Sequence, residues 1–322
     1  MVLQVKIICI AVFFCLFLNT LNSYAFDKSD SSAMTHYIMG VIYSDLGEAD
    51  KAIEEYKRSL KDQETLTTYL NLASVYIKKD DIDSAIKELN SAAKFAPDAV
   101  EPHAILAILY AARKTFDLAT DEYRIALEKA SKLHPNDIEI AKNLGIVYMQ
   151  QKKYGEASRV FRLLVDLSPK DAEAHFYLAN AYYETNELTL TEKELKAAIE
   201  INPDYHEALN FLGYMYVEEN RNLDAAEKMI GAAIKMNPDN GAYIDSLGWL
   251  YYKKGKVKEA AIELEKAVSL LEDPVIYDHL GDVYFELKDY KAARLSWQKA
   301  LELNPQRKEV LKKLENVKNN GS

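Results

Sequence analysis

The sequence predicts an all-α solenoid of helix–turn–helix units, and three observations indicate this fold class. A Gly or Ala stands three residues before a Tyr eight times, and successive small residues lie 33, 34, 38, 34, 34, 35 and 33 positions apart. Apolar residues around each small residue recur at helical spacing. Gly and Pro are sparse, 11 and 8 in 322 residues, as expected for helices joined by short turns. The eight pairs are Gly40–Tyr43, Ala73–Tyr76, Ala107–Tyr110, Gly145–Tyr148, Ala179–Tyr182, Gly213–Tyr216, Gly248–Tyr251 and Gly281–Tyr284.

Each unit is numbered here from the residue seven before its small residue, so that the small residue occupies position 8. The predicted units, one to eight, are residues 33–65, 66–99, 100–137, 138–171, 172–205, 206–240, 241–273 and 274–307. Positions 7, 8 and 11 form the apolar stripe of a first helix, and a small residue at position 20 lies in a second helix. Small residues at positions 8 and 20 let the two helices approach closely. We expect the bulky residues at position 24 to fill the space towards the next unit.

This pattern resembles the tetratricopeptide repeat, whose hallmark is an aromatic residue, Leu-Gly, Tyr, Ala, a second aromatic, Ala and a closing Pro. The resemblance covers residues 33–307, with Thr191 in place of Ala in unit five and extra residues in units three and six. It implies a right-handed superhelix of about eight units whose concave surface binds other proteins. Residues 308–322 are predicted to form a capping helix and tail, because Val310, Leu311, Leu314 and Val317 fall on one helical face.

Residues 1–25 have the pattern of a secretory signal peptide: Lys6, then twelve apolar residues, then Ser23-Tyr24-Ala25. We expect cleavage after Ala25, a short polar linker at residues 26–32, and a periplasmic or secreted protein without stable membrane insertion. The alternative is an uncleaved anchor. Both cysteines lie in this segment, and lipid attachment at Cys15 is disfavoured because Phe14, not a small residue, precedes it.

Composition and spacing argue against catalysis, cofactors, metals and nucleic acid. The net charge is −10, whereas phosphate contacts need clustered Lys and Arg. His36, His103 and His175 all occupy position 4, where a packed core histidine is a better interpretation than a metal ligand, because stacked units hold equivalent residues about 10 Å apart. No Gly-rich phosphate loop or Ser-His-Asp arrangement is present. The sequence therefore predicts a protein that is not an enzyme.

An acidic residue recurs at position 2 in four consecutive units, as Glu101, Glu139, Glu173 and Glu207. A strip that attracts a basic partner is one interpretation. The other is structural, because Asp98, Asn136 and Asp204 each stand three residues before a Glu and would form capping boxes.

The inner face of the first helices is approximated by positions 2, 5, 6, 9, 12 and 13. These positions hold eleven acidic residues against three lysines, and eight aromatic residues in units five to eight against one in units one to four. Positions 5 and 9 are expected to point inward and to line a protein-binding groove. The predicted lining is Phe176, Asn180, Asn210, Tyr214, Asp245, Trp249, Asp278 and Asp282. Amides can pair with a peptide backbone, and Trp and Tyr often dominate binding energy, so an extended or mildly basic protein segment would fit.

The last two units carry a weaker resemblance, through Asp245-Ser246-Leu247-Gly248-Trp249 and His279-Leu280-Gly281-Asp282, to proteobacterial envelope repeat proteins. It implies a non-catalytic scaffold or adaptor of the bacterial cell envelope. The alternative is a component of an exopolysaccharide or pilus export or assembly system.

Overall fold

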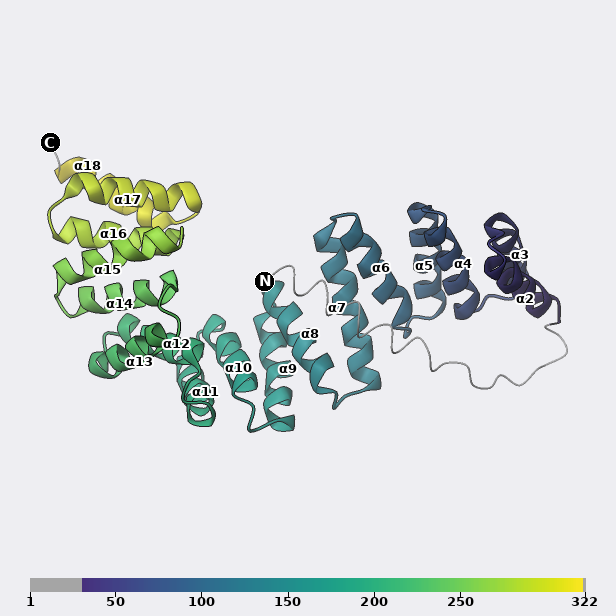
Figure 1. The fold of residues 1–322 in the computed structure, drawn as a ribbon, viewed down its shortest axis with the longest axis horizontal. Coiled ribbons are helices and arrows are strands. Elements are labelled where there is room, and N and C mark those ends of the chain that lie inside the picture. The colour runs from purple at the N-terminus through teal and green to yellow at the C-terminus, as the bar shows by residue number, and fades with distance from the viewer. Residues whose placement is uncertain (1–30, 321–322) are drawn as a thin grey trace. The chain divides into compact units, whose positions relative to one another are not determined.

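The computed structural model describes residues 31–320, and this part of the chain holds seventeen α-helices and no strand (Figure 1). The predicted all-α repeat array is confirmed. The paired helices are α2 (Ser31–Asp45) and α3 (Ala49–Asp62), α4 (Leu66–Lys78) and α5 (Ile82–Phe95), α6 (Glu101–Ala112) and α7 (Phe116–Leu133), α8 (Ile138–Gln150) and α9 (Tyr154–Leu167), α10 (Ala172–Glu184) and α11 (Leu188–Ile201), α12 (His206–Glu218) and α13 (Leu223–Met236), α14 (Gly241–Lys253) and α15 (Val257–Leu270), and α16 (Pro274–Glu286) and α17 (Tyr290–Leu303), followed by α18 (Lys308–Asn320). The predicted signal peptide, its cleavage site and residues 26–30 of the predicted linker lie outside the described residues.

The described residues form two compact parts, 31–129 and 130–320, and the boundary between them falls within α7. Helices that follow one another along the chain pack together, for example α3 on α2 and α4, and α15 on α14 and α16. Each unit therefore has its own small core shared with its neighbours, as in other repeat arrays.

The small residue at position 8 is required by the side chain at position 24 of the same unit. A Cβ atom added at Gly145 would lie 2.3 Å from Phe161, and one added at Gly281 would lie 2.4 Å from Trp297. These rings lie against the first helix of their own hairpin, and they also reach the next unit as expected, since Phe161 stacks on Tyr177 and Trp297 shares a core with Val310. In unit six, the extra residue moves this role to Ile230, which lies against Gly213.

Every turn between the two helices of a unit has its position 15 residue in the left-handed region. The residues are Gly47, Asp80, Lys114, Lys152, Asn186, Asn220, Gly255 and Lys288, with φ between 50° and 77°. Only two of the eight are Gly, so six turns hold a side chain where Gly is favoured. This common conformation keeps the hairpin geometry constant from unit to unit.

The predicted capping boxes are wrong. Helices α6 and α12 begin after Val100 and Tyr205, which make no side-chain cap, and α8 begins after Asp137, whose carboxylate accepts from the Ile140 amide. Asp98, Asn136 and Asp204 thus lie too early in the chain to cap these helices. The position 2 glutamates do lie in the first turn, where the helix dipole favours negative charge.

In units six to eight, first helices of neighbouring units approach each other more closely than second helices do. Helix α12 contacts α14, and α14 contacts α16, whereas contacts of α13 with α15 and of α15 with α17 are weaker or absent. Within residues 206–303, the array therefore bends so that first helices line its inner side, as the resemblance implied.

Candidate functional site

Half-buried aromatic side chains gather around the first helices of units five and six. Phe176 and Tyr183 of α10 meet Phe211 of α12, with ring centroids 6.3 Å and 5.0 Å from Phe211 and edge-to-face geometry in both pairs. Tyr205 packs on Phe176 at 5.1 Å, and Tyr214 lies one turn after Phe211. We call these five residues the aromatic cluster; each keeps part of its surface exposed. Such rings offer apolar contact area at low entropic cost.

The two predicted amides differ in their hydrogen bonding. The Asn180 side-chain nitrogen donates to the Phe176 carbonyl at 2.7 Å, which fixes the amide against its own helix. The Asn210 side-chain oxygen is buried and accepts no hydrogen bond within the described chain. Both residues lie beside the aromatic cluster, on α10 and α12.

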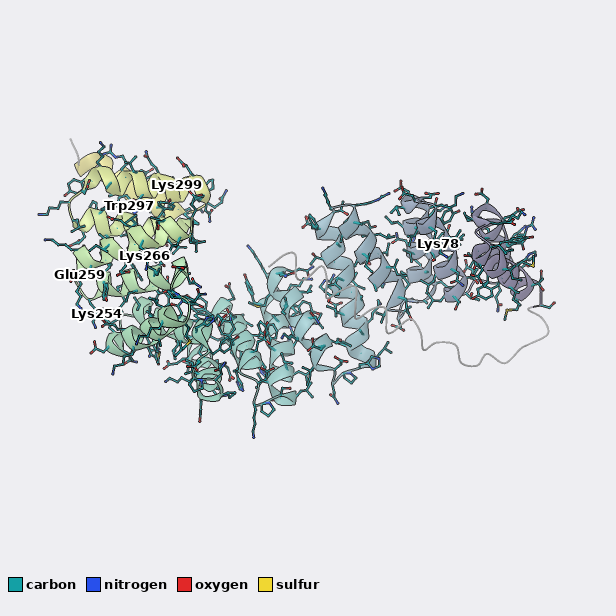
Figure 2. The ribbon with its side chains drawn as sticks, viewed as in Figure 1. Lys78, Lys254, Glu259, Lys266, Trp297 and Lys299 are labelled. Atoms are coloured by element: carbon teal, nitrogen blue, oxygen red, sulfur yellow. The ribbon has the colours of Figure 1, made fainter. Side chains whose placement is uncertain are left out.

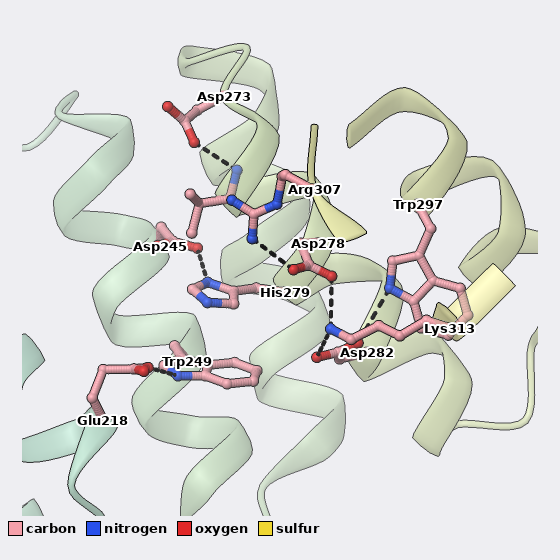
Figure 3. Close-up of polar contacts among 11 residues, drawn as sticks. Glu218, Asp245, Trp249, Asp273, Asp278, His279, Asp282, Trp297, Arg307 and Lys313 are labelled. Carbon is pink, nitrogen blue, oxygen red and sulfur yellow. Dashed lines mark hydrogen bonds and ion pairs between the residues drawn. The ribbon is translucent and has the colours of Figure 1, made fainter. Parts of the chain in front are cut away.

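Trp249 is part of the core, contrary to the expectation that its ring faces the groove. Its side chain is 8% exposed and lies between Tyr252 and His279, with ring centroids 4.7 Å and 4.1 Å away and nearly parallel planes. The indole nitrogen donates to Glu218 of α12 at 2.5 Å (Figure 3). The ring thus joins units six, seven and eight. Tyr214 packs against the same core, so it lines the groove with only part of its ring.

A recurring contact explains this burial, since position 5 meets position 6 of the following unit. The pairs are Tyr37 with Asn71, Phe176 with Phe211, Asp245 with His279 and Asp278 with Lys313. Position 9 meets the same neighbour in the last units, where Trp249 stacks on His279 and Asp282 binds Lys313. Positions 5 and 9 therefore lie partly between units and are only partly available to a ligand.

The three predicted aspartates are paired within the protein. Asp245 lies 2.8 Å from His279 Nδ1, and both side chains are buried. Asp278 binds Arg307 at 2.8 Å and Lys313 of α18 at 2.7 Å, and Asp282 binds Lys313 at 2.7 Å (Figure 3). Burial raises the pKa of Asp282, and although burial alone would lower the pKa of Lys313, its bonds to Asp278 and Asp282 raise it. The negative charge expected of Asp278 and Asp282 is thus largely neutralised by Arg307 and by Lys313 of α18.

Exposed acids of the inner face remain near the aromatic cluster. Glu184 ends α10 and Glu218 ends α12, and both residues are exposed. Burial raises the pKa of Tyr183, and Glu218 and Glu184 add to this shift through their negative charge. A hollow lined by Tyr183, Asn186, Leu188, Met215, Glu218 and Glu219 lies here. The structure thus brings exposed aromatic and acidic groups together at units five and six.

The position 4 histidines are hydrogen-bonded within their own units. His36, His103 and His175 place Nδ1 within 2.6–2.7 Å of a glutamate nineteen residues later: Glu55, Glu122 and Glu194. Among residues 31–320, no group of three His, Cys, Asp or Glu side chains is arranged to hold a metal ion. In the same range no helix combines the length and apolarity needed to cross a membrane.

A carboxylate network links units five and six on the outer side. Glu192 binds Arg221 and Lys196, each at 2.7 Å, and accepts from the Tyr216 hydroxyl at 2.8 Å. The hydrogen bond from Arg221 is the main cause that lowers the pKa of Glu192 from 4.5 to about 2.

We expect this network to make stability acid-sensitive. Because the folded-state pKa of Glu192 is depressed, its stabilisation is present above pH 4.5 and is lost as pH falls towards 2. Glu192→Gln should lower the free energy of unfolding at pH 7 by about 1–3 kcal/mol and flatten its dependence over that pH window. Urea unfolding at pH 7 and at about pH 3 measures this, with Glu200→Gln on the exposed side of α11 as control. Equal pH dependence in both variants would contradict the assignment.

Comparison with known proteins identifies the repeat. A family model described as the cilia and flagella-associated protein 70 C-terminal domain matches residues 99–316, and a model described as tetratricopeptide repeat matches residues 35–61 and 66–98. The chain belongs to the tetratricopeptide repeat family. The two tetratricopeptide matches coincide with the helix pairs α2–α3 and α4–α5, and the longer match spans α6 to α17 and part of α18.

Solved structures share the tetratricopeptide fold. A tetratricopeptide protein of Thermus thermophilus is 21% identical with a TM-score of 0.50, covering 56% of this chain and 98% of its own. A chain of the Cut9–Hcn1 hetero-tetramer of the APC/C is 17% identical with a TM-score of 0.55, and the match covers 88% of this chain and 69% of that chain. A tetratricopeptide protein of Parabacteroides merdae is 16% identical with a TM-score of 0.49, and the match covers 89% of this chain and 98% of that chain. A search of curated proteins finds no match.

Two groups of residues at the candidate site were not among those predicted from the sequence. Tyr183, Tyr205 and Phe211 complete the aromatic cluster but were not among the predicted lining, because only positions 5 and 9 were taken to point inward. Arg307 and Lys313 pair with Asp278, and the 35-residue spacing from Asp278 to Lys313, close to the repeat period, is a signal that could have found Lys313.

Proposed function

We propose that this tetratricopeptide array is a non-catalytic scaffold that binds an extended segment of a partner protein along the inner side of units five and six. The observation that carries the proposal is the aromatic cluster, which stays half-exposed, whereas unit seven buries Asp245, Ser246 and Trp249 at the equivalent positions. Aromatic side chains with partly exposed faces are the groups that most often supply binding energy at protein interfaces. The tetratricopeptide fold itself supports a general role in protein–protein interaction.

The preferred segment is extended and mildly basic. Glu184 and Glu218 border the aromatic cluster and are exposed, and Glu286 adds a third exposed acid on α16. Asp278 and Asp282 contribute little attraction because Arg307 and Lys313 pair with them, and Asp245 is buried against His279. The charge that remains should affect association rate and salt dependence more than final affinity.

The proposed place of action is the bacterial cell envelope, after export. The pattern of residues 1–25 and the resemblance of the last two units support this proposal. N-terminal sequencing of fractionated cells should find a mature chain that begins at Phe26. Retention of Met1, or acylation at Cys15, would contradict it. Genes for a protease or assembly factor beside this gene would favour the scaffold, and genes for glycosyltransferases would favour the polysaccharide-export alternative.

Loss of the aromatic cluster should weaken partner binding. With a partner recovered by crosslinking and then purified, Tyr183→Ala and Phe211→Ala should each weaken binding by about 2 kcal/mol, a roughly thirtyfold increase in Kd. Titration calorimetry measures the affinity, and circular dichroism checks that helical content is retained. Ile262→Ala is the matched control, because this exposed side chain lies on a second helix, α15. Unchanged affinity in both cluster variants would disprove the proposed binding surface.

A further inference from the structure

Three rings of the array share one arrangement with a carboxylate and a cation. The hydroxyl or indole N–H of the ring donates a hydrogen bond to the carboxylate, and the cation that binds this carboxylate lies over the same ring, between 4.4 Å and 6.0 Å from its centroid. The three sets are Tyr177 with Glu173 and Lys142, Tyr216 with Glu192 and Arg221, and Trp297 with Asp282 and Lys313. Figure 3 shows the third set. The array thus holds basic side chains with a ring and a carboxylate together.

A fourth carboxylate that is bonded to a ring, Glu218, has no cation. Its Oε1 accepts from the Trp249 indole nitrogen at 2.5 Å, and Lys253 lies over that ring at 4.9 Å from the centroid. Within residues 31–320, however, no basic side chain pairs with Glu218. In the same range, the carboxylates bonded to Tyr69 and Tyr284 also lack a cation, so this feature alone does not define a site.

Glu218 differs from those two carboxylates because it lines the hollow at units five and six. The hollow has a volume of about 310 Å³, and its other lining residues are Tyr183, Asn186, Leu188, Met215 and Glu219. This volume is at the lower end of the range for ligand pockets and is enough for one long side chain. Burial raises the pKa of Tyr183, and the negative charge of Glu218 adds to this shift, so the ring and the carboxylate can act on one ligand. In the described part of the chain, no cation lies over the Tyr183 ring.

Basic side chains from the turns of units six and seven are held by other groups. Arg221 binds Glu219 at 2.5 Å and Glu192 at 2.7 Å. Lys254, which Figure 2 labels, binds two carboxylates of α13, each at 2.7 Å, and the lysines on either side of it lie over rings of their own unit. Arg221 therefore offsets part of the charge of Glu219, and the charge of Glu218 remains available to a ligand.

We propose that this hollow receives one lysine or arginine side chain of the partner segment. The cationic group binds Glu218, and the aliphatic stem lies against the Tyr183 ring and along Leu188 and Met215, as basic side chains do in the three internal sets. The inference rests on the proposed function, since it requires the segment to cross units five and six. It adds one requirement, a basic residue at the point where the segment passes the hollow.

Peptides selected from a random-sequence display library on the purified chain are the probe. Peptides that bind the parent chain but not Phe211→Ala occupy the proposed surface, and they should carry Lys or Arg. In a synthetic copy of one such peptide, the basic residues are replaced one at a time by norleucine, which keeps an aliphatic stem and removes the charge. One of these replacements should raise the Kd about tenfold, because it removes a charge-assisted hydrogen bond.

A matched pair of chain variants locates the partner of that charge. The chain with Glu218→Gln and Glu219→Gln should bind the selected peptide about tenfold more weakly and should no longer distinguish it from the norleucine peptide. Gln at position 218 still accepts from the Trp249 indole. Glu200→Gln with Glu259→Gln is the control, because it removes the same charge from exposed positions of α11 and α15 and should leave both affinities unchanged (Figure 2 labels Glu259). Circular dichroism checks the folding of each variant.

Two kinds of contrary result are distinguishable. Selected peptides that depend on Phe211 but lack a basic residue, or whose affinity does not change with norleucine or with the Glu218 and Glu219 variant, would overturn this inference and leave the proposed function standing. A library that yields no peptide dependent on Phe211 would contradict the proposed binding surface itself, and the inference with it.

Discussion

Replacing Trp249 with Ala is expected to destabilise units six to eight by about 3–5 kcal/mol, the cost typical of removing a large buried aromatic side chain. The ring is 8% exposed, stacks between Tyr252 and His279 and bonds to Glu218, so its loss opens a cavity at the contact of three units. It also removes a stacked neighbour of His279, which holds the buried Asp245. Chemical denaturation followed by circular dichroism measures the loss.

Trp249→Phe is the matched control for the Trp249 prediction. Phe keeps an aromatic ring at this site and loses the hydrogen bond to Glu218, so the cost should be about 1 kcal/mol, near that of a single hydrogen bond. A Trp249→Ala chain that unfolds at the parent denaturant concentration would contradict the burial described here.

Replacing Phe161 with Ala in unit four should cost about 3–5 kcal/mol and change how the array unfolds. Phe161 is fully buried, fits against Gly145 and stacks on Tyr177 of the next unit at 5.2 Å. Because a repeat array is stabilised by nearest-neighbour contacts, weakening a central unit uncouples the units on either side. We therefore expect a single unfolding transition of the parent to become two or more. Leu144→Ala, at a 4% exposed side chain, should act in the same direction at about 2–5 kcal/mol.

Leu163→Ala is the control for unit four, since this leucine lies on the same helix as Phe161 and is 39% exposed. It should cost no more than about 1 kcal/mol, because little apolar surface is lost. Differential scanning calorimetry resolves the number of transitions. One unchanged transition in Phe161→Ala would mean that unit four does not couple its neighbours.

The fold could be predicted from sequence because its packing repeats. Where Gly occupies position 8, a large side chain of the second helix meets it, from Gly40 with Tyr56 to Gly281 with Trp297. A contact that recurs about every 34 residues leaves a visible period, whereas an isolated contact does not. The position 24 ring reaches the next unit as predicted, but its contact with position 8 of its own unit was not predicted, because periodicity gives spacing along the chain and not every neighbour that a side chain touches.

The residues that line the groove were harder to predict than the fold, because spacing along the chain does not give the neighbours of each side chain. Position 5 carries the half-exposed Phe176 in unit five and the buried Asp278 in unit eight, because the residue at position 6 of the following helix differs. Phe211 stands there in one case and Lys313 in the other. Amphipathic spacing predicts that α18 covers the last unit, but it does not predict that α18 supplies the cation for Asp278. The first residue of a helix was also not given by the spacing. The N-cap of α8 is Asp137, one residue after the expected Asn136.

The most direct test of the proposed binding surface is site-specific photocrosslinking in the native cells. A photoreactive amino acid replaces Tyr183 in the aromatic cluster or, in a separate chain, Ile262 on the second helix α15. The proposed function predicts a covalent adduct with a partner protein from position 183 and none from position 262. Adducts of equal yield at both positions, or an adduct at position 262 alone, would contradict it.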